Sequence, residues 1–465
     1  MSKPKVGLLC LMLELYDLVP GLKPRMAEFA AELVQALDPY AAVDFPGVCN
    51  TREEVDQAVT GFETADKDLI VVVLLTYAPS HIALPALLHT RLPFVILNTQ
   101  QMGSITPRVT SQETLENHGM HGVQDLCNVL LRSGRDVRLI TGHYRDDAVL
   151  AELSSWFKAA GAVRFLKQVR IALLGYPMQG MGDFSIDQTA LLAQVGVSVY
   201  HLAMKTVAER ADKAPAELIQ QALTEDRKRF RIAEDVTEEE HAASSRLTWA
   251  LRSILEEQGL HGFAAHFSAI AEEGRLDTLP FLAASELLGE GYGFGGEGDV
   301  TSAAAVALMA HLAGAANFTE MFSMDPAGDA VLMMHMGEGN WTMARKDEPV
   351  HLLRSTLGLV DLRVAPLLPA FSLEPGPVTL VSLTTVADGR LRFVVTEGEV
   401  MDFPYVVDLG RPHYKFRPDS ADGLSGFLNR FSLAGGSHHQ ALAYGHWAVT
   451  LEKLAQLLNV DYARV

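Results

Sequence analysis

The 465-residue chain is poor in cysteine. Its three cysteines, Cys10, Cys49 and Cys127, lie far apart in the sequence and form no Cys-x-x-Cys pair. An odd, widely spaced set does not build a disulfide framework, and it also lacks the spacing of a structural zinc site. We therefore expect buried free thiols in a protein of a reducing compartment.

Basic residues and long hydrophobic runs are also scarce. The chain has 38 Lys and Arg against 57 Asp and Glu, a net charge of -19, whereas nucleic-acid binding needs a basic surface. The apolar N-terminal stretch is interrupted by Glu14 and Asp17, and the longest apolar run, which begins at Leu69, has only the length of a strand. We expect a cytoplasmic protein with no nucleic-acid or membrane partner.

The first third of the chain alternates short apolar runs with amphipathic ones. Near-continuous apolar runs between helical patterns are typical of a parallel sheet covered on both faces. We expect strands over residues 5–11, 42–48, 68–75, 93–99 and 136–144, with helices over 24–37 and 52–62. This pattern predicts a first α/β domain over residues 1–165.

The alternation restarts at residue 168 and changes character beyond about residue 320. Strands over 168–175 and 197–204, with a long charged helical region over 214–258, predict a central α/β domain over residues 166–315. Residues 378–400 alternate and contain an Asp-Gly turn, which predicts an antiparallel hairpin. The predicted fold class is α/β: two Rossmann-like αβα domains, then a β-rich, barrel-like domain over residues 316–465 that a helix over 446–459 closes.

Five glycines surround one carboxylate at residues 291–298, Gly-Tyr-Gly-Phe-Gly-Gly-Glu-Gly. The stretch matches the dinucleotide fingerprint, but that fingerprint must follow a strand, whereas residues 279–290 have helical periodicity. A nicotinamide oxidoreductase is therefore a distant alternative. Asp299 is the stronger cap for the helix that follows, which leaves Glu297 free to act in a site.

Further carboxylates and imidazoles follow this glycine-rich loop. Glu320 lies among apolar neighbours, His335 ends an apolar strand, and His438-His439 stand behind two glycines. Each residue alone has an ordinary structural explanation, such as an ion pair or a satisfied core histidine. Adjacent side chains diverge, so we expect one of the paired histidines to bind and the other to position it or the substrate. Together the residues indicate a divalent metal site, with Mn²⁺, Mg²⁺ or Co²⁺ favoured over structural zinc.

The same residues carry a family resemblance. The chain resembles the L-arabinose isomerase group of the L-fucose/L-arabinose isomerase superfamily, most closely at residues 279–300. The resemblance implies that Glu297 and Glu320 are catalytic acid/base residues and metal ligands. It implies that His335, in a His-Met-x-Glu context, and His439, in a Gly-Gly-x-His-His element, complete the ligand set, with His438 beside the substrate.

Weaker matches imply further substrate contacts. Glu14 and Tyr16 fall on a substrate loop in which the family has Gln in place of Glu14, which puts the identity of the sugar in doubt. Asn117-His118-Gly119 resembles an element whose histidine reaches a neighbouring subunit's site, so His118 is a candidate. Phe294, Tyr16 and Met178 are candidate pocket walls, although a core role is equally open for each.

The resemblance implies a metal-dependent aldose–ketose isomerase that acts through an enediol. The first expectation is L-arabinose to L-ribulose, with D-galactose to D-tagatose as a further activity. Another pentose, a hexose or a 6-deoxy sugar stays open, as does a non-catalytic sugar-binding protein. Family members are tetramers or hexamers, so we expect a homo-oligomer with a small sugar as its ligand.

Overall fold

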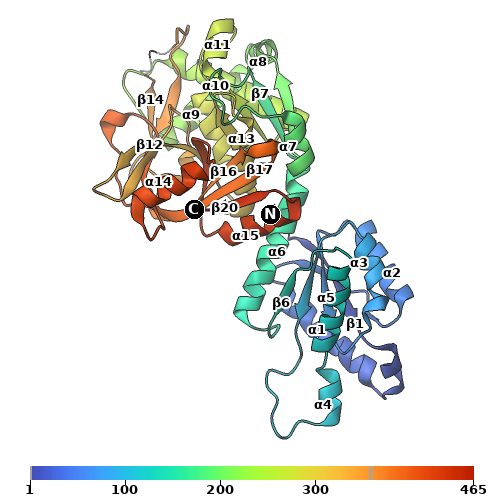
Figure 1. Cartoon of the computed structure of the whole chain (residues 1–465). Helices are drawn as coiled ribbons and strands as arrows, with labels where there is room; N and C mark the ends of the chain where they lie inside the picture. Colours follow the sequence, from blue (N-terminus) through green and yellow to red (C-terminus); the bar gives the residue numbers. More distant parts are fainter. Residues whose placement is uncertain (1–2, 356–357, 359) are drawn as a thin grey trace. The chain divides into compact units, whose positions relative to one another are not determined.

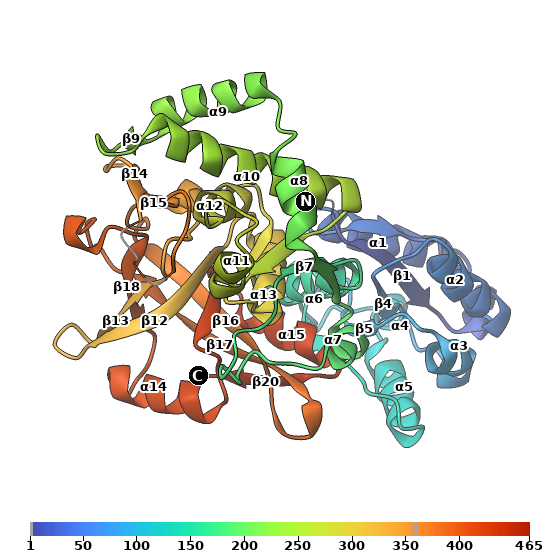
Figure 2. The same ribbon diagram turned by 90° about the horizontal axis from the view of Figure 1, so that it is seen from above.

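The computed structural model describes residues 3–355, 358 and 360–465. The chain divides into two compact units, Met1–Arg164 and Phe165–Val465, which are drawn in Figures 1 and 2 and described separately below. The expected central and C-terminal domains lie together in the second unit. Among the described residues, no helix is both long and apolar enough to cross a membrane.

The first unit is built on a parallel sheet with the strand order β2-β1-β4-β5-β6, in which β3 also pairs with β1. The residues of β4 are all buried, as the near-continuous apolar run predicts. The strands are β1 (Lys5–Leu11), β2 (Ala42–Asp44), β3 (Val48–Cys49), β4 (Leu69–Leu74), β5 (Phe94–Asn98) and β6 (Leu139–Thr141). The helices are η1 (Glu14–Leu18), α1 (Leu22–Leu37), α2 (Arg52–Thr64), η2 (Ser80–Ile82), α3 (Leu84–His89), α4 (Ser111–Glu116), α5 (Met120–Arg132) and α6 (Asp147–Leu166), which runs across the boundary.

The second unit begins with a four-stranded parallel sheet of order β11-β10-β7-β8. The charged region expected to be one helical stretch is two helices, α9 and α10, separated by the short strand β9 (Arg231–Ile232). The sheet strands are β7 (Arg170–Leu174), β8 (Ser198–Leu202), β10 (Gly262–Ala265) and β11 (Gly293–Gly296). The helices are α7 (Gln188–Val195), α8 (Met204–Ala211), α9 (Ala216–Arg229), α10 (Glu238–Gln258), α11 (Phe267–Glu273), α12 (Phe281–Gly289) and α13 (Val300–Ala313).

The rest of the second unit is a closed antiparallel sheet with one added strand. The strand order is β16-β19-β12-β13-β18-β17-β20, and β16 also pairs with β17, so six of the strands form a ring. This confirms the expected hairpin and the barrel-like C-terminal part. The strands are β12 (Asn317–Asp325), β13 (Ala330–Met334), β16 (Gly376–Thr385), β17 (Leu391–Val400), β18 (His413–Pro418), β19 (His439–Tyr444) and β20 (Asp461–Arg464).

Smaller elements complete this unit. A three-stranded sheet joins β14 (His351–Arg354), β15 (Leu367–Ala370) and β9. The remaining helices are η3 (Trp341–Met343), η4 (Ala387–Gly389), η5 (Val407–Leu409), α14 (Gly423–Leu433) and α15 (Ala448–Leu458). The helix over 446–459 therefore does not end the fold, because β20 follows it and pairs in parallel with β17.

Helix α13 joins the parallel sheet to the closed sheet. It contacts β7, β10 and β11 of the parallel sheet as well as β12, β16 and β19 of the closed sheet, and Figure 2 shows it in the interior of the unit. Twelve of its fourteen residues are buried, and no single face is apolar, as expected for a helix surrounded by protein. The start of α13 therefore brings the end of β11 close to β12 and β19.

Candidate active site

The structure turns the expected glycine-rich loop into a buried strand. Glycine has low strand propensity, so packing and not propensity explains this strand. A Cβ at Gly293 would lie 2.0 Å from the Ala303 carbonyl oxygen, so only glycine fits there. A Cβ at Gly295 would lie 1.9 Å from the Asp299 carbonyl oxygen. These glycines therefore let β11 lie directly against α13.

Glu297 follows this strand in a strained conformation. It has a φ of 56°, in the left-handed region that non-glycine residues seldom adopt, and Gly298 beside it has a φ of 84°. A Cβ at Gly296 would lie 2.8 Å from the ring of His335, and one at Gly298 would lie 2.5 Å from the Tyr176 carbonyl oxygen. The flanking glycines thus allow the neighbouring groups to approach closely. The strained backbone conformation is that of Glu297, the residue expected to be catalytic.

His439 faces Glu297 from the first position of β19. Its Nε2 atom lies 3.5 Å from the Glu297 Oε2 atom and has no hydrogen-bond partner among the described residues. Its Nδ1 atom donates to the Asp299 Oδ2 atom over 3.1 Å, and both side chains are fully buried. A carboxylate behind the imidazole leaves Nε2 free to act as a metal ligand.

His335 follows β13 and has the same kind of support. Its Nδ1 atom donates to the Glu338 Oε2 atom over 2.7 Å, and its ring centre lies 5.2 Å from that of His439. Burial favours the neutral ring, but the charges of Glu338, Glu320 and Glu297 outweigh it and raise the pKa of His335.

Glu320 lies within β12. It is paired directly with His439 of β19 on one side and with Met334 of β13 on the other. Directly opposite residues of antiparallel strands project to the same face of the sheet. The register therefore brings the second glutamate, half-buried, to the face that carries His439.

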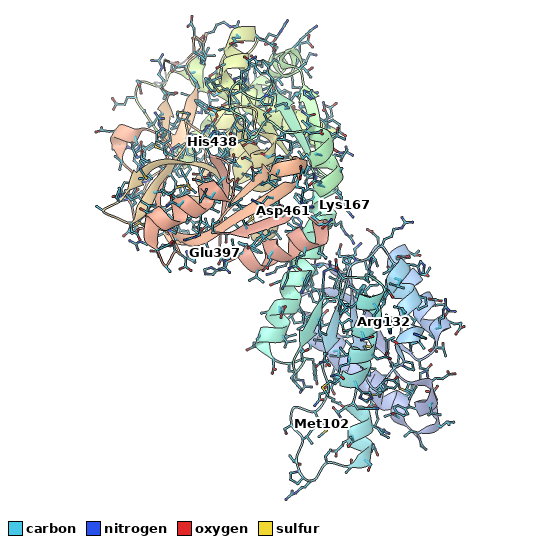
Figure 3. The ribbon with its side chains drawn as sticks, viewed as in Figure 1. Met102, Arg132, Lys167, Glu397, His438 and Asp461 are labelled. Carbon is cyan, nitrogen blue, oxygen red and sulfur yellow. The ribbon has the colours of Figure 1, made fainter. Side chains whose placement is uncertain are left out.

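The adjacent histidines do not diverge as we expected. His438 lies in a bend before β19, so its ring centre is 4.2 Å from that of His439, and its Nε2 atom is 3.8 Å from the Glu297 Oε2 atom. Its Nδ1 atom donates to Asp183 over 2.7 Å, and this hydrogen bond is the main reason that the pKa of His438 is raised to about 10. Figure 3 labels His438 within the larger unit.

The charges around Glu297 favour its ionised form. Burial alone would raise its pKa, but the nearby imidazoles of His438, His335 and His439 lower the pKa below the ordinary value. Ligand atoms of Glu297, His438 and His439 lie within 4.8 Å of one another. The unpartnered buried Nε2 atom, the carboxylate-backed imidazoles and the nearby carboxylates fit a divalent cation.

The cavity on the His335 side of the cluster is small. It has a volume of about 30 Å³, and its lining includes Glu297, His335, Met336, Phe281 and Glu338. A volume of this size holds a water molecule or an ion. His438 does not line this cavity, and its side chain is 34% exposed.

Two other predicted pocket residues lie behind or beside the cluster. Phe294 is 1% exposed and packs edge-on against Phe263 and Phe318, so it belongs to the core. Met178 is half-buried, and its backbone N–H donates to the Glu297 carbonyl oxygen over 2.9 Å. Met178 thus supports the strained residue through the backbone.

Glu14, Tyr16 and His118 belong to the first unit. Glu14 is exposed in η1, and the Tyr16 hydroxyl lies 2.9 Å from the His118 Nε2 atom. The His118 Nδ1 atom is 2.7 Å from the Leu115 carbonyl oxygen. Burial is the largest influence on His118, and it lowers the pKa of the imidazole. Their proposed substrate contacts stay predictions.

Sequence reasoning missed the carboxylates that hold the histidines. Asp299 was expected as a helix cap, which it is, through a 2.9 Å hydrogen bond from the Ser302 backbone, but it also holds His439. Glu338 stands three residues after His335, a spacing that could have suggested its role. Asp183 gave no such signal, because it lies about 255 residues from His438 in the sequence.

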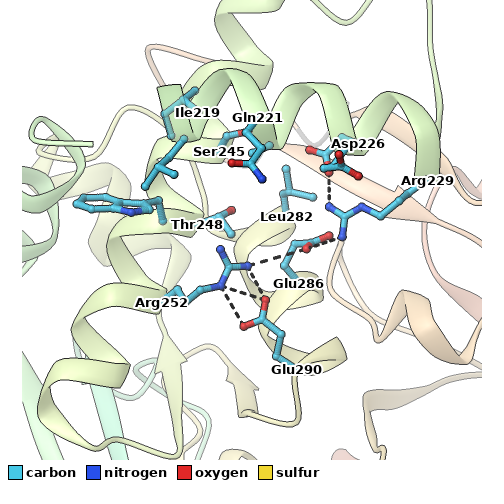
Figure 4. Close-up of a pocket in the computed structure, with 14 residues that line it drawn as sticks. Ile219, Gln221, Asp226, Arg229, Ser245, Thr248, Arg252, Leu282, Glu286 and Glu290 are labelled. Atoms are coloured by element: carbon cyan, nitrogen blue, oxygen red, sulfur yellow. Dashed lines mark hydrogen bonds and ion pairs between the residues drawn. The ribbon is translucent and has the colours of Figure 1, made fainter. Parts of the chain in front are cut away.

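A second, larger cavity of about 420 Å³ lies between α9, α10 and α12, away from Glu297 (Figure 4). Ion pairs cross it: Arg229 pairs with Asp226 and Glu286, and Arg252 pairs with Glu290. Burial raises the pKa of Glu286 despite the charge of Arg229. These pairs connect α9 and α10 to the buried helix α12 and to the residue that follows it.

The parallel sheets, the closed C-terminal sheet and the Glu–His cluster at their junction define an α/β enzyme with a barrel-like C-terminal part. Family models match successive parts of the chain: the L-arabinose isomerase N-terminal domain at residues 19–168, the central domain at 170–315 and the C-terminal domain at 315–461. The chain belongs to the L-arabinose isomerase group, and it is accordingly an aldose–ketose isomerase.

Relatives named L-arabinose isomerase match most of the chain at low identity. The protein of Nocardioides sp. is 26% identical, with 96% of this chain and 91% of the relative covered. That of Clavibacter sepedonicus is 25% identical, with 93% and 87% covered. That of Thermotoga maritima is 25% identical, with 86% and 82% covered. A solved periplasmic solute-binding protein from Actinobacillus succinogenes with bound D-allose reaches a TM-score of only 0.18 at 14% identity, with 59% of this chain and 84% of that chain covered.

Proposed function

We propose that this enzyme is a metal-dependent isomerase that converts L-arabinose to L-ribulose. The observation that carries the proposal is the arrangement around Glu297. Two imidazoles, each backed by a carboxylate, stand beside it, and Glu320 occupies the position opposite His439 on the neighbouring strand. Relatives that match 93% and 96% of the chain are named for this reaction.

The two glutamates would carry the proton transfers. Isomerisation removes the proton from C2 of the aldose and returns a proton to C1, while the hydroxyl proton on O2 leaves and O1 gains one. A carboxylate on each side of the sugar can act as base and acid in turn. Glu297 is held ionised by its histidine neighbours, which suits it to accept a proton. Glu320, half-buried on the adjoining strand, would serve as its counterpart.

Glu297, Glu320, His335 and His439 would hold a divalent cation, for which we propose Mn²⁺, with Mg²⁺ and Co²⁺ as candidates. When bound, the cation supplies Lewis-acid polarisation of the sugar oxygens. The protein's own part is to fix the two imidazoles through Asp299 and Glu338. We also propose that the enzyme is cytoplasmic, forms a homo-oligomer and also acts on D-galactose.

The test is ketose formation by protein stripped with EDTA and then given Mn²⁺, Mg²⁺ or Co²⁺, on a panel of pentoses, hexoses and 6-deoxy sugars. We expect metal-dependent ketose, with L-arabinose the best substrate. Glu297→Gln and Glu320→Gln should each abolish turnover. The matched control is Glu290→Gln, which changes an exposed glutamate seven residues earlier. Absence of ketose from the whole panel, with metal shown to be bound, would overturn the proposal.

A preference for a sugar other than L-arabinose has one observation in its favour. Glu14 stands exposed in the N-terminal segment where the resemblance would place a glutamine. A carboxylate accepts hydrogen bonds only, whereas an amide also donates them, so the two recognise different hydroxyl patterns. If another sugar exceeds L-arabinose in kcat/KM, Glu14→Gln should shift the preference towards L-arabinose.

A further inference from the structure

One carboxylate outside the Glu–His cluster joins two distant parts of the second unit. Asp183 lies between β7 and α7, in a segment with no regular structure. Its Oδ2 atom accepts hydrogen bonds from the Ser437 Oγ atom over 3.0 Å, from the His438 backbone N–H over 3.0 Å, and from the His438 Nδ1 atom over 2.7 Å. A single side chain of the α/β part thus holds both the backbone and the ring of the residue before β19.

The neighbouring residue reinforces this attachment. Phe184 is fully buried, and its ring stacks on His439 with centres 5.5 Å apart and an interplanar angle of 14°. Phe184 also contacts His438, with ring centres 5.6 Å apart. The pair Asp183-Phe184 therefore holds both rings of the histidine pair, one through a charged hydrogen bond and the other through packing.

The direction of the His438 ring follows from the contact with Asp183. With Nδ1 donating to Asp183, the other ring nitrogen points away from it, and Nε2 lies 3.8 Å from the Glu297 Oε2 atom. The small cavity beside His335 is lined by Glu297 but not by His438. Because the His438 side chain is 34% exposed, it can contact a sugar that reaches Glu297 from solvent beside it.

We propose that Asp183 is a positioning residue for the isomerase reaction: it holds His438 so that the Nε2 atom faces both the Glu297 carboxylate and the sugar. His438 in this arrangement contacts the substrate and is not a ligand of the cation. This inference rests on the proposed function, and it adds a residue from the α/β part to the machinery carried by the glycine-rich strand and the closed sheet.

The test compares Asp183→Ala, Asp183→Asn and a matched control, Asp187→Ala. Asp187 is four residues further on and caps α7 through the Thr189 backbone, so its loss should lower the melting temperature slightly without touching the histidines. In the Mn²⁺-loaded enzyme with L-arabinose, we expect Asp183→Ala to lower kcat by about 10- to 100-fold, the usual effect of losing such a supporting contact. KM should change less than kcat.

Three further readouts separate positioning from a merely structural role. Asp183→Asn should recover part of kcat, because its amide oxygen can accept the same hydrogen bonds. The isotope effect with sugar deuterated at C2 should rise in Asp183→Ala, since proton transfer becomes more limiting. The affinity for Mn²⁺ alone should stay within about threefold of wild type, well short of the 10- to 100-fold loss that follows when support for a metal ligand is removed.

Several results would overturn the proposal. One is a kcat for Asp183→Ala equal to that of Asp187→Ala. Another is a tenfold loss of Mn²⁺ affinity, which would make His438 a ligand. Crystals of Mn²⁺-loaded Asp183→Ala decide the point independently of turnover: the His438 ring should leave Glu297, and an unmoved ring would refute the positioning role. Failure of the wild-type enzyme to make any ketose would refute the proposed function instead.

Discussion

Two alanine substitutions in the glycine-rich segment separate the effect of backbone conformation from that of close packing. Gly298 has a φ of +84°, and a Cβ there would lie 2.5 Å from the Tyr176 carbonyl oxygen and 2.9 Å from the Pro177 Cα atom. Gly291 has a φ of +91°, but a Cβ there would meet no atom within 4 Å. Gly298→Ala therefore combines an unfavourable backbone conformation with overpacking. Gly291→Ala has only the unfavourable backbone conformation.

The expected magnitudes follow from these distances. The left-handed conformation costs a non-glycine residue about 1–2 kcal/mol, which applies to both variants. Overpacking against backbone that cannot rotate away adds about 1–3 kcal/mol to Gly298→Ala alone. We therefore expect Gly298→Ala to melt at a temperature lower than Gly291→Ala by roughly 2 °C or more.

Gly298→Ala should also alter the active site. Relief of the contact pushes Tyr176 and Pro177 outward, and the next residue, Met178, donates its backbone N–H to the Glu297 carbonyl oxygen. Gly298→Ala should thus lower kcat, whereas Gly291→Ala should leave it near the wild-type value. Thermal melting and ketose formation, measured on both variants, provide the test. Equal melting temperatures and equal kcat values for the two variants would refute the reasoning.

Two further predictions concern the carboxylates that support the histidines, and a third concerns Glu286 in the larger cavity. Asp299→Asn should weaken Mn²⁺ binding by about 10- to 100-fold through His439, yet keep most of the stability, because Asn also caps a helix well; a large loss of melting temperature without a loss of affinity would contradict this. Glu338→Gln should weaken Mn²⁺ binding similarly through His335, as calorimetry would show, and an unchanged affinity would refute that support. Burial raises the pKa of Glu286, so the folded protein binds this proton more tightly than the unfolded chain. The contribution of Glu286 to the free energy of unfolding should therefore fall as pH rises above about 4.3. Glu286→Gln should flatten that part of the plot of melting temperature against pH. Identical plots for the variant and the wild type would contradict this prediction.

The parts of the fold that follow from local patterns were predictable. The run at β4 is apolar throughout because both faces of a central parallel strand are buried, and the Asp-Gly turn between β16 and β17 is typical of a hairpin. The expected one-sided burial of this hairpin is not found, because residues 378–384 of β16 are all buried. The strand β11 was not predictable from propensity, because four residues rich in glycine form it. The glycines of β11 reflect its contact with α13. Any side chain at Gly293 or Gly295 would overlap the backbone at or just before that helix.

The candidate site divides in the same way. Glu297, Glu320, His335 and the pair His438-His439 could be proposed from the sequence because carboxylates and imidazoles among glycines and apolar residues are unusual. The choice of His439 over His438 as a ligand came from the family resemblance. The supporting carboxylates could not be proposed, apart from Glu338, because tertiary contacts choose them: Asp299 reaches His439 across 140 residues. The convergence of His438 on Glu297 also depends on a bend before β19 that overrides the usual divergence of adjacent side chains.

The most direct test of the central claim is the position of the cation. Crystals of the full chain soaked in Mn²⁺ would be measured at a wavelength at which manganese scatters anomalously. We predict one strong peak between Glu297, Glu320 and the Nε2 atoms of His335 and His439, with ligand distances of about 2.0–2.3 Å. A peak bound by His438 in place of His335, or no peak at Glu297 in crystals that carry manganese elsewhere, would contradict the account.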